Sequence, residues 1–436
     1  MKLCHTLLAV LFLASCAARA QEVPATAGNQ ATTGNQAATS PPATGRAGLP
    51  VNGMLHYDLH YSQSTQFGGV QGDQQWSSTS GDASSTNTNA RLPFSMQYGG
   101  GYGWAWNGAP SAGNVFQHLS LSQGVAWRRW NLSASGNASY TFETPTTGFT
   151  GVPGTGEPIG GPGSNPLSGL TILTQNTRSV SDTMTVSIGH SLGYATSLSF
   201  GGSSGQSHFI DNNGGNSDTL MVNAGITRRL NARSSGSASY SFSRFNYGAN
   251  YAYQVNGAQI SFSQANSVQF GISRQWNWKI GTSVSIGPQW VSSSNSAISP
   301  SSTMLSMGAS VNDTFKFGTG SLSYSRGSTG GSGYMLGAES DVASANFSHQ
   351  FGKKTSFGLT GSYMRTAGLN GNGLTNGKFA GVQASRQVGR YLSVFGNYTA
   401  VSQSSNLVST ANVLNNVFQS VSFGIGYSPR EIRLKK

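Results

Sequence analysis

Two histidines and an aspartate near the start of the patterned part of the chain are the residues best suited to acid–base chemistry or metal binding. His56, Asp58 and His60 stand at alternate positions, with Tyr57 and Leu59 between them. Alternate residues of a strand share one face, and imidazole and carboxylate groups are common proton carriers and metal ligands. A hydrolase or a metal centre would need further groups on neighbouring strands, which the sequence does not place beside these three. We therefore interpret them as polar side chains that face water.

The composition excludes several classes of protein. Only 9% of the 436 residues are charged, whereas Gly alone numbers 59, and soluble domains are usually about one quarter charged. With 13 Asp and Glu in total, no paired-carboxylate site is evident, so we expect no enzyme, no metal and no cofactor. The formal net charge of +12 is spread over turns and strand ends. Because it forms neither basic blocks nor a stripe interleaved with aromatic residues, we expect no nucleic-acid partner.

Residues 1–20 predict a secretory signal peptide, with one lysine near the start, an apolar run from Leu7 to Leu13 and small residues after it. Two processing sites stay open: Ala18-Arg19-Ala20 fits cleavage by signal peptidase, and Leu13-Ala14-Ser15-Cys16 resembles the lipobox of bacterial lipoproteins. Because Cys4 and Cys16 are the only cysteines, the mature chain has no disulfide and no catalytic thiol. Cys16 is at most a lipidation site.

Residues 21–50 repeat Ala, Thr, Gly, Asn, Gln and Pro. Such a segment buries too little apolar surface to offset the entropy of ordering, so we predict a disordered low-complexity periplasmic leader. Residues 51–429 are the predicted barrel, and residues 430–436 are a basic C-terminal tail.

The segment 51–429 alternates apolar or aromatic residues with small polar residues. Val284, Ile286 and Trp290 fall on one face of a predicted strand, and Ser283 and Ser285 fall on the other. The runs last about ten to fourteen residues, which is long enough for a tilted membrane crossing. No run of 18 apolar residues follows the signal segment, so an inner-membrane helical protein is excluded.

Short and long connections alternate along the barrel segment. Tight turns near Arg128-Arg129 and at 316–318 contrast with Gly- and Ser-rich loops such as 143–176 and 402–415. This alternation is typical of outer-membrane barrels, which have short periplasmic turns and long extracellular loops. We predict an all-β fold, a single transmembrane antiparallel up-and-down β-barrel of about 18 strands. Sixteen strands remain an alternative, because the predicted second strand, 75–88, has almost no outward apolar residues.

Aromatic residues recur about ten residues after each short turn, on the predicted outward face. Amphipathic rings favour the headgroup level of a bilayer, so we predict an aromatic girdle of Tyr140, Tyr240, Trp290, Tyr324, Tyr363 and Tyr398. Arg244, Arg326 and Arg365 follow three of these tyrosines on the same face and suggest contact with lipopolysaccharide phosphates. The alternative, that strand ends simply tolerate charge, stays open.

The predicted inward face is rich in hydroxyl and amide groups and nearly free of charge. The lumen-lining candidates are His56, Asp58, His60, Ser135, Asn137, Ser139, Ser239, Ser241 and Ser323. Charge-selective pores carry rings of charged side chains at their constriction, so this face favours small, mainly uncharged solutes. The longest loop is rich in Gly and Pro and is long enough to enter the lumen. Its constriction candidates are Phe149, Pro153 and Glu157.

Four segments, TGFTGVPGTGEPIGG, ITRRLNARSS, GPQWVSSSNS and FGIGYSPRE, resemble an uncharacterised family of Gram-negative outer-membrane, porin-like β-barrel proteins. The resemblance extends from about Met54 to Glu431. It implies a barrel fold and an outer-membrane location, and no substrate or site residues. More distantly, the chain is similar to barrels associated with exopolysaccharide loci. It departs from common outer-membrane barrels at its C-terminus, where Tyr427 is followed by a basic segment instead of ending the chain.

We therefore expect a porin-like channel of the outer membrane for passive diffusion of small polar solutes. The alternative is a plugged structural or surface barrel, or an accessory barrel of exopolysaccharide export. The expected partners are outer-membrane lipid, lipopolysaccharide, the barrel-assembly machinery and the solutes. The solute, the open or plugged state of the lumen and a homo-oligomeric state are left open.

Overall fold

A computed structural model describes residues 54–67, 74–87, 92–106, 114–143, 177–210, 216–247, 261–296, 299–329, 338–369, 373–406, 416–430 and 432–433. Eighteen long strands and one short strand lie within these residues. Their bounds are β1 Met54–Phe67, β2 Gln74–Asn87, β3 Phe94–Ala105, β4 Asn114–Trp127, β5 Trp130–Glu143, β6 Thr177–Ser191, β7 Thr196–Phe209, β8 Ser217–Arg229, β9 Ser234–Tyr247, β10 Phe262–Gln275, β11 Ile280–Ser293, β12 Ser302–Phe315, β13 Gly318–Thr329, β14 Ala338–Phe351, β15 Thr355–Gly368, β16 Leu374–Gln387, β17 Leu392–Ser405, β18 Asn416–Tyr427 and β19 Ile432–Arg433.

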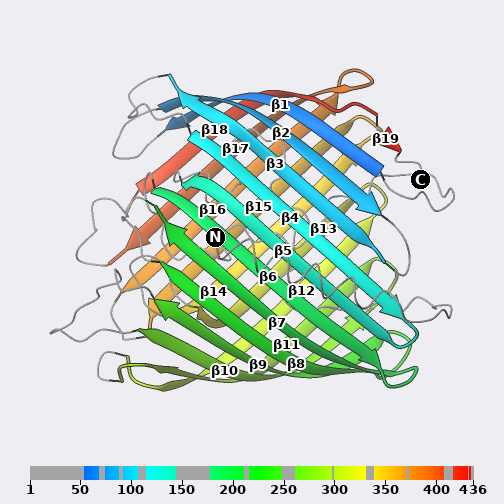
Figure 1. Ribbon diagram of the computed structural model, residues 1–436, viewed down its shortest axis with the longest axis vertical. Helices are drawn as coiled ribbons and strands as arrows, with labels where there is room; N and C mark the ends of the chain where they lie inside the picture. The colour runs from blue at the N-terminus through cyan, green and yellow to red at the C-terminus, as the bar shows by residue number, and fades with distance from the viewer. Residues whose placement is uncertain are drawn as a thin grey trace.

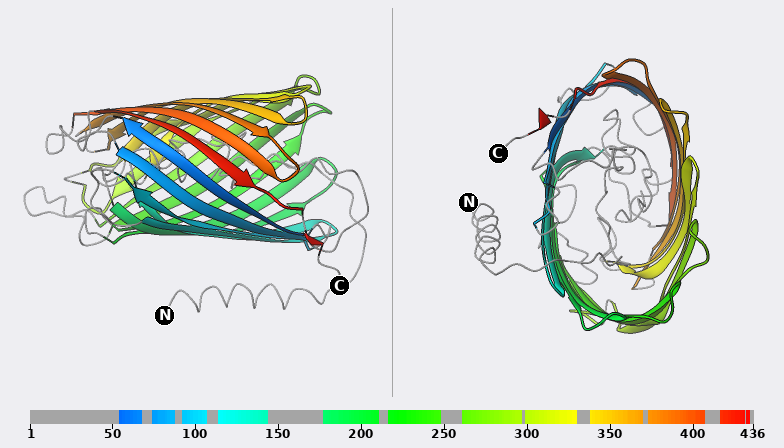
Figure 2. Two further views of the ribbon diagram at one scale, coloured as in Figure 1. Left: turned by 90° about the horizontal axis from the view of Figure 1, so that it is seen from above. Right: turned by 90° about the vertical axis from the view of Figure 1, so that its right-hand side faces the viewer.

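The strands form one closed antiparallel barrel. Each of the long strands pairs with its neighbours in the sequence, and β1 pairs with β18, from Leu59 opposite Tyr427 to Phe67 opposite Gln419. Figure 1 shows the strands tilted across the wall, and Figure 2 shows the closed ring, which is oval when viewed along its axis. The short β19 pairs with the first two residues of β1. The prediction of an all-β up-and-down barrel of about 18 strands is confirmed.

Alternation along each strand decides which side chains face outward. In β1, Leu59 is 53% exposed whereas Ser62 is 1% exposed, and the same alternation of exposed apolar and less exposed polar residues continues around the ring. A closed barrel has only two faces, and its strands present their residues to them in turn. The apolar set covers the outer wall, and the polar set lines the lumen.

The predicted second strand is present as β2, although it carries few apolar residues. It pairs with β1 over its full length, from Met54 opposite Thr86 to Gln66 opposite Gln74. Backbone hydrogen bonding to two neighbouring strands therefore holds β2 in the barrel, and the alternative of 16 strands is wrong. For another strand, the alternation in the sequence predicts residues 378–388, whereas the structure begins β16 at Leu374. Here Thr375 donates a hydrogen bond to Ser405 of β17 at 3.1 Å, and the backbone ladder continues where the apolar alternation has ended.

Short turns join the strands at one end of the barrel. Arg128 in the turn between β4 and β5 has φ 40°, and Gly352 in the turn between β14 and β15 has φ 65°. Positive φ is usual for glycine and uncommon for arginine, so the first of these turns is the more strained. The start of β1 and the end of β18 lie at this same end, which we call the turn end. In the described part of the chain, no helix is long and apolar enough to cross a membrane.

Candidate functional site

The inner wall of the barrel is the candidate functional site. The strand registers place the side chains of Ser135, Asn137 and Ser139 of β5 on the inward face. The same holds for Ser239 and Ser241 of β9 and for Ser323 of β13. The wall that these strands form is therefore hydroxyl- and amide-rich on its lumen side.

Many of the inward hydroxyls pair with each other across neighbouring strands. The oxygen–oxygen distances lie between 2.6 and 2.9 Å in Ser62–Ser78, Ser133–Ser187, Ser139–Ser181, Ser235–Ser273, Ser241–Ser267, Ser283–Ser310, Ser323–Ser344, Thr319–Ser348 and Ser356–Ser385. A hydroxyl both donates and accepts, so each pair keeps hydrogen-bonding capacity toward the lumen. Such a wall suits neutral polar molecules, which exchange hydrogen bonds with it at little cost.

The three residues of β1 that are suited to acid–base chemistry or metal binding, His56, Asp58 and His60, share the inward face. The His56 ring nitrogen Nε2 lies 3.0 Å from the Asp58 oxygen Oδ2, and the Ser428 hydroxyl lies 3.3 Å from the same nitrogen. His60 Nε2 instead lies 3.8 Å from the Asp82 oxygen Oδ2 of β2. The alternate positions therefore give a local His56–Asp58 pair, while His60 belongs to a second group.

That second group contains two residues that the sequence did not single out, Asp82 of β2 and His118 of β4. The Asp82 carboxylate lies between two imidazoles, with Oδ2 3.8 Å from His60 Nε2 and Oδ1 3.8 Å from His118 Nε2. All three side chains are partly buried, with relative exposures between 15% and 31%. These distances are those of ion pairs when the histidines carry a proton. We call His56, Asp58, His60, Asp82 and His118 the lumen His–Asp cluster.

Gly99 of β3 lets this cluster form. Asp82, Gly99 and His118 lie opposite one another on three successive strands. A Cβ at Gly99 would overlap both the Asp82 carboxylate and the His118 ring. Only a residue without a side chain leaves these two groups room to approach across the intervening strand.

We expect Gly99→Ala to lower the stability of the barrel by about 1–3 kcal/mol, because the added methyl group overpacks the site and forces Asp82 and His118 apart. Gly136→Ala is the matched control, since a Cβ at Gly136 of β5 meets nothing within 4 Å. The measurement is the urea midpoint of unfolding in lipid vesicles. Equal midpoints for the two variants would show that Gly99 does not determine the approach of Asp82 to His118.

An apolar patch interrupts the polar inner wall on β14 to β18. It consists of one inward side chain from each of these five strands, and each is at most 8% exposed: Val342, Met364, Phe379, Val401 and Phe418. The strand registers place Val342 opposite Met364, and Val401 opposite both Phe379 and Phe418. The sequence predicted a hydroxyl- and amide-rich face here, so the patch is a feature that it missed.

The girdle residues lie on the outer wall, and four tyrosines hydrogen-bond to the next strand. Tyr240 and Tyr363 donate to Asn266 and Asn376 at 2.7 and 3.2 Å. Tyr324 donates to Asp341 at 2.7 Å, and Tyr398 donates to Gln419 at 3.1 Å. Trp290 lies at the corresponding place on β11 and is 44% exposed. The remaining girdle residue, Tyr140, is outward on β5. These rings combine an apolar body with a satisfied polar tip, as interfacial aromatics do.

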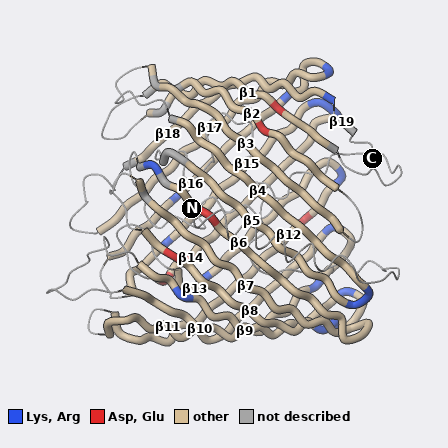
Figure 3. Tube along the Cα trace, in the orientation of Figure 1, with Lys and Arg blue, Asp and Glu red and all other residues tan. Residues whose placement is uncertain are grey.

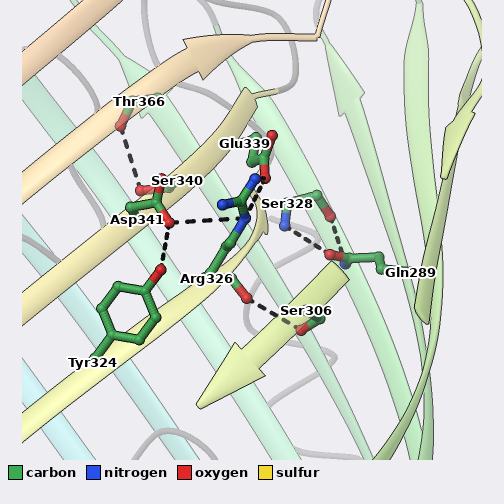
Figure 4. Close-up of polar contacts among 9 residues, drawn as sticks. All are labelled: Gln289, Ser306, Tyr324, Arg326, Ser328, Glu339, Ser340, Asp341 and Thr366. Atoms are coloured by element: carbon green, nitrogen blue, oxygen red, sulfur yellow. Dashed lines mark hydrogen bonds and ion pairs between the residues drawn. The ribbon is translucent and has the colours of Figure 1, made fainter. Parts of the chain in front are cut away.

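Arg326 on the outer wall has its charge compensated within the protein. Its Nε donates to Glu339 at 2.6 Å, its Nη2 also contacts Glu339, and Asp341 lies 3.9 Å away (Figure 4). Figure 4 also shows Tyr324 bonded to the same Asp341. The Arg244 guanidinium of β9 instead lies 4.2 Å from the centre of the Phe262 ring. Arg365 of β15 stands opposite Asp341 of β14. The three arginines that the sequence grouped together thus have different surroundings.

Four predicted residues lie outside the described part of the chain: the constriction candidates Phe149, Pro153 and Glu157, and Cys16. Among the described residues, no group of three or more His, Cys, Asp or Glu side chains is arranged to hold a metal ion. The described lumen offers a solute hydrogen-bonding groups, the charge of the lumen His–Asp cluster and one apolar patch.

No family model and no curated protein matches this chain, so its family resemblance stays a prediction. Among solved structures it is similar to OccAB4 of Acinetobacter baumannii, with 8% identity and a TM-score of 0.44 over 88% of this chain and 99% of that chain. It is similar to OccK2 (OpdF) of Pseudomonas aeruginosa, with 12% identity and a TM-score of 0.43 over 86% and 98% of the two chains. OccK2 (OpdF) in complex with glucuronate gives 11% identity and the same TM-score and shares. Similarity at this level carries neither substrate nor site residues to this chain.

Proposed function

We propose that this protein is a channel of a Gram-negative outer membrane, through which small polar and mainly uncharged solutes diffuse. The observation that carries the proposal is the division between the two faces of one closed 18-strand wall. The outer face is apolar and exposed, and the inner face is lined by hydroxyl and amide groups. A barrel of this strand number encloses a lumen that side chains from its strands alone do not fill.

The outer wall supports a location within lipid. Its exposed side chains include Leu59, Phe270, Val284, Leu322 and Phe423, each 53% exposed or more. Soluble monomers rarely expose so continuous an apolar surface. A closed ring also leaves no backbone hydrogen-bonding group unpaired along a strand edge, which a lipid environment requires.

The inner wall supports neutral solutes. The lumen His–Asp cluster gathers ionisable side chains on β1, β2 and β4, and the inward faces of β5, β6, β8 and β9 carry mainly hydroxyls and amides. We infer weak charge selection and weak binding through hydrogen bonds, as in passive diffusion.

Swelling of vesicles that contain the refolded protein tests this function. Glucose and glucuronate are a matched pair of solutes, since they have nearly the same size and differ in one carboxylate. We expect permeation of glucose to exceed that of glucuronate by a small factor, about two- to fivefold, because few charges line the path. No swelling with either solute, together with no conductance in a planar bilayer, would exclude a diffusion channel.

A narrowed or plugged barrel is the second candidate, and burial of inward side chains favours it. Val401, Thr366 and Thr375 are inward residues of β15 to β17, yet none of them is more than 1% exposed. Side chains on the wall of a wide open lumen would contact water. Conductance decides between the two functions: large ohmic openings support the channel, and a silent bilayer with an inserted barrel supports the plugged, structural protein.

A further inference from the structure

The outer wall carries an excess of cations at the turn end, which the proposed function does not use. Figure 3 shows Lys and Arg gathered at this end of the barrel. Three of them are outward residues near the ends of strands: Arg228 of β8, Arg274 of β10 and Arg386 of β16. The others lie in the turns, apart from Arg229, which is the last residue of β8. We call the whole set the turn-side cation ring: Arg128, Arg129, Arg228, Arg229, Arg233, Arg274, Lys279, Lys316, Lys353, Lys354, Arg386 and Arg390.

The strand-borne arginines lie between exposed apolar residues. Arg274 stands on the outer face between Ile272 and Trp276, which are 55% and 51% exposed. Arg228 stands in the same way between Ile226 and Leu230. A cation in this position is expected at the boundary between the lipid tails and the headgroups. Its apolar neighbours contact the lipid tails, and its long side chain extends toward the polar headgroups.

Aromatic rings hold several of the cations at this depth. The Arg274 guanidinium lies 4.2 Å from the centre of the Trp276 ring, and Lys279 Nζ lies 4.7 Å from that of Trp278. Lys316 lies over Phe317 at 5.1 Å, and Arg390 lies over Tyr391 at 5.6 Å. Aromatic residues favour the headgroup region, so a cation held over such a ring is placed beside lipid phosphates.

The described carboxylates do not compensate the charge of the ring. In the part of the chain that the structure describes, no carboxylate forms an ion pair with a member of the turn-side cation ring. One carboxylate, Asp313, occupies the corresponding outward position on β12. At the opposite end, Arg326 is paired with Glu339 and Asp341. Among the described residues, the positive charge of the ring is left open to anions from outside the protein.

We propose that the turn-side cation ring binds the phosphate groups of anionic phospholipids in the leaflet that the short turns face. This inference rests on the proposed membrane location. A phosphatidylglycerol headgroup presents a phosphate without a cation of its own, whereas zwitterionic headgroups carry an ammonium group beside the phosphate. The ring therefore selects anionic over zwitterionic phospholipid, at a depth that the apolar neighbours of Arg228 and Arg274 fix.

Electron spin resonance of spin-labelled lipids tests the selection. The full barrel is reconstituted in phosphatidylcholine vesicles at about 0.1 M salt, where screening is moderate, and the motionally restricted fraction is compared for spin-labelled phosphatidylglycerol and phosphatidylcholine. We expect phosphatidylglycerol to associate about two- to fivefold more strongly, the size of effect that one interfacial cation gives. Replacing Arg228, Arg274 and Arg386 together by Gln should bring this ratio close to one.

A triple variant at the other end of the barrel is the matched control. It replaces three other outward cations by Gln: Arg244, Arg365 and Lys378. It therefore removes the same number of cations from the end of the barrel opposite the turn end. This variant should keep the preference for phosphatidylglycerol. An equal loss in both triple variants would mean that net charge alone attracts the lipid, which overturns the proposal.

Further outcomes separate the inference from the function on which it rests. A wild-type barrel that inserts and conducts but shows no preference for phosphatidylglycerol overturns the lipid site alone. A barrel that does not insert into any vesicle overturns the membrane location and the lipid site together. Inorganic phosphate at constant ionic strength should leave the lipid ratio unchanged, and a collapse of the ratio would assign the ring to free phosphate instead.

Discussion

Replacing Ile286 with arginine should prevent stable insertion of the barrel, whereas arginine at the adjacent Ser285 should be tolerated. Ile286 lies in the middle of β11, faces outward and is 47% exposed, with Phe270 and Met307 opposite it. An arginine on the lipid face near the bilayer midplane costs about 2–4 kcal/mol. This is a large part of the total stability of a folded protein, about 5–15 kcal/mol.

Ser285 is a close control because it belongs to the same strand and faces the lumen. Its cross-strand neighbours are Gly271 and Gly308, which leave space for a longer side chain. The measurement is the fraction of protein that migrates as a folded barrel on an unheated gel after refolding into vesicles. If Ile286→Arg and Ser285→Arg refold to the same extent, the outward face of β11 does not contact lipid.

Replacing Asp82 with asparagine should shift the ion selectivity of the channel toward anions. One charge at about 8 Å from an ion's path in water changes the ion's energy by about 0.5 kcal/mol, which is about a twofold change in its local concentration. Because the charge acts on K⁺ and Cl⁻ in opposite directions, the permeability ratio of K⁺ to Cl⁻ should fall by about fourfold. Asp313→Asn is the control. Asp313 lies on the outer wall, so this substitution removes the same charge outside the lumen.

Reversal potentials across a KCl gradient measure this ratio in the wild type and in both variants. Equal shifts for Asp82→Asn and Asp313→Asn would remove the cluster from the conduction path.

The barrel could be predicted from the sequence because apolar and polar residues alternate along its strands and so mark its outer and inner faces. In β11, Val284 and Ile286 alternate with Ser283 and Ser285, and the same two-residue period recurs between short turns. Strand ends were harder to predict where polar residues continue the backbone ladder, as at Leu374 and Thr375 of β16. Backbone hydrogen bonds do not depend on side-chain polarity, so the apolar pattern ends before the strand does.

The candidate site could be predicted only in part. Alternation placed His56, Asp58 and His60 on one face, but the partners Asp82 and His118 come from other strands and depend on register. The sequence does carry one signal for their approach: Gly99 belongs to a run of three glycines within a strand, and glycine in a strand often marks a close approach. Phe379 and Val401 stand in the inward phase of β16 and β17, but most of the rest of that phase is polar or glycine, so an apolar patch on the inner wall was not predicted.

The pairing of β19 with β1 brings the last described residues of the chain beside the first ones, with Ile432 opposite Leu55 and Arg433 opposite Met54. Together with the seam between β1 and β18, this gives the wall a cyclic order with no privileged starting strand. A variant in which the end of β18 is linked to the start of β1, and the chain is cut between two other strands, would keep the same pairs of hydrogen-bonded long strands. Circular permutation is therefore compatible with the architecture, because the strand pairing that holds the ring together does not depend on which connection is cut.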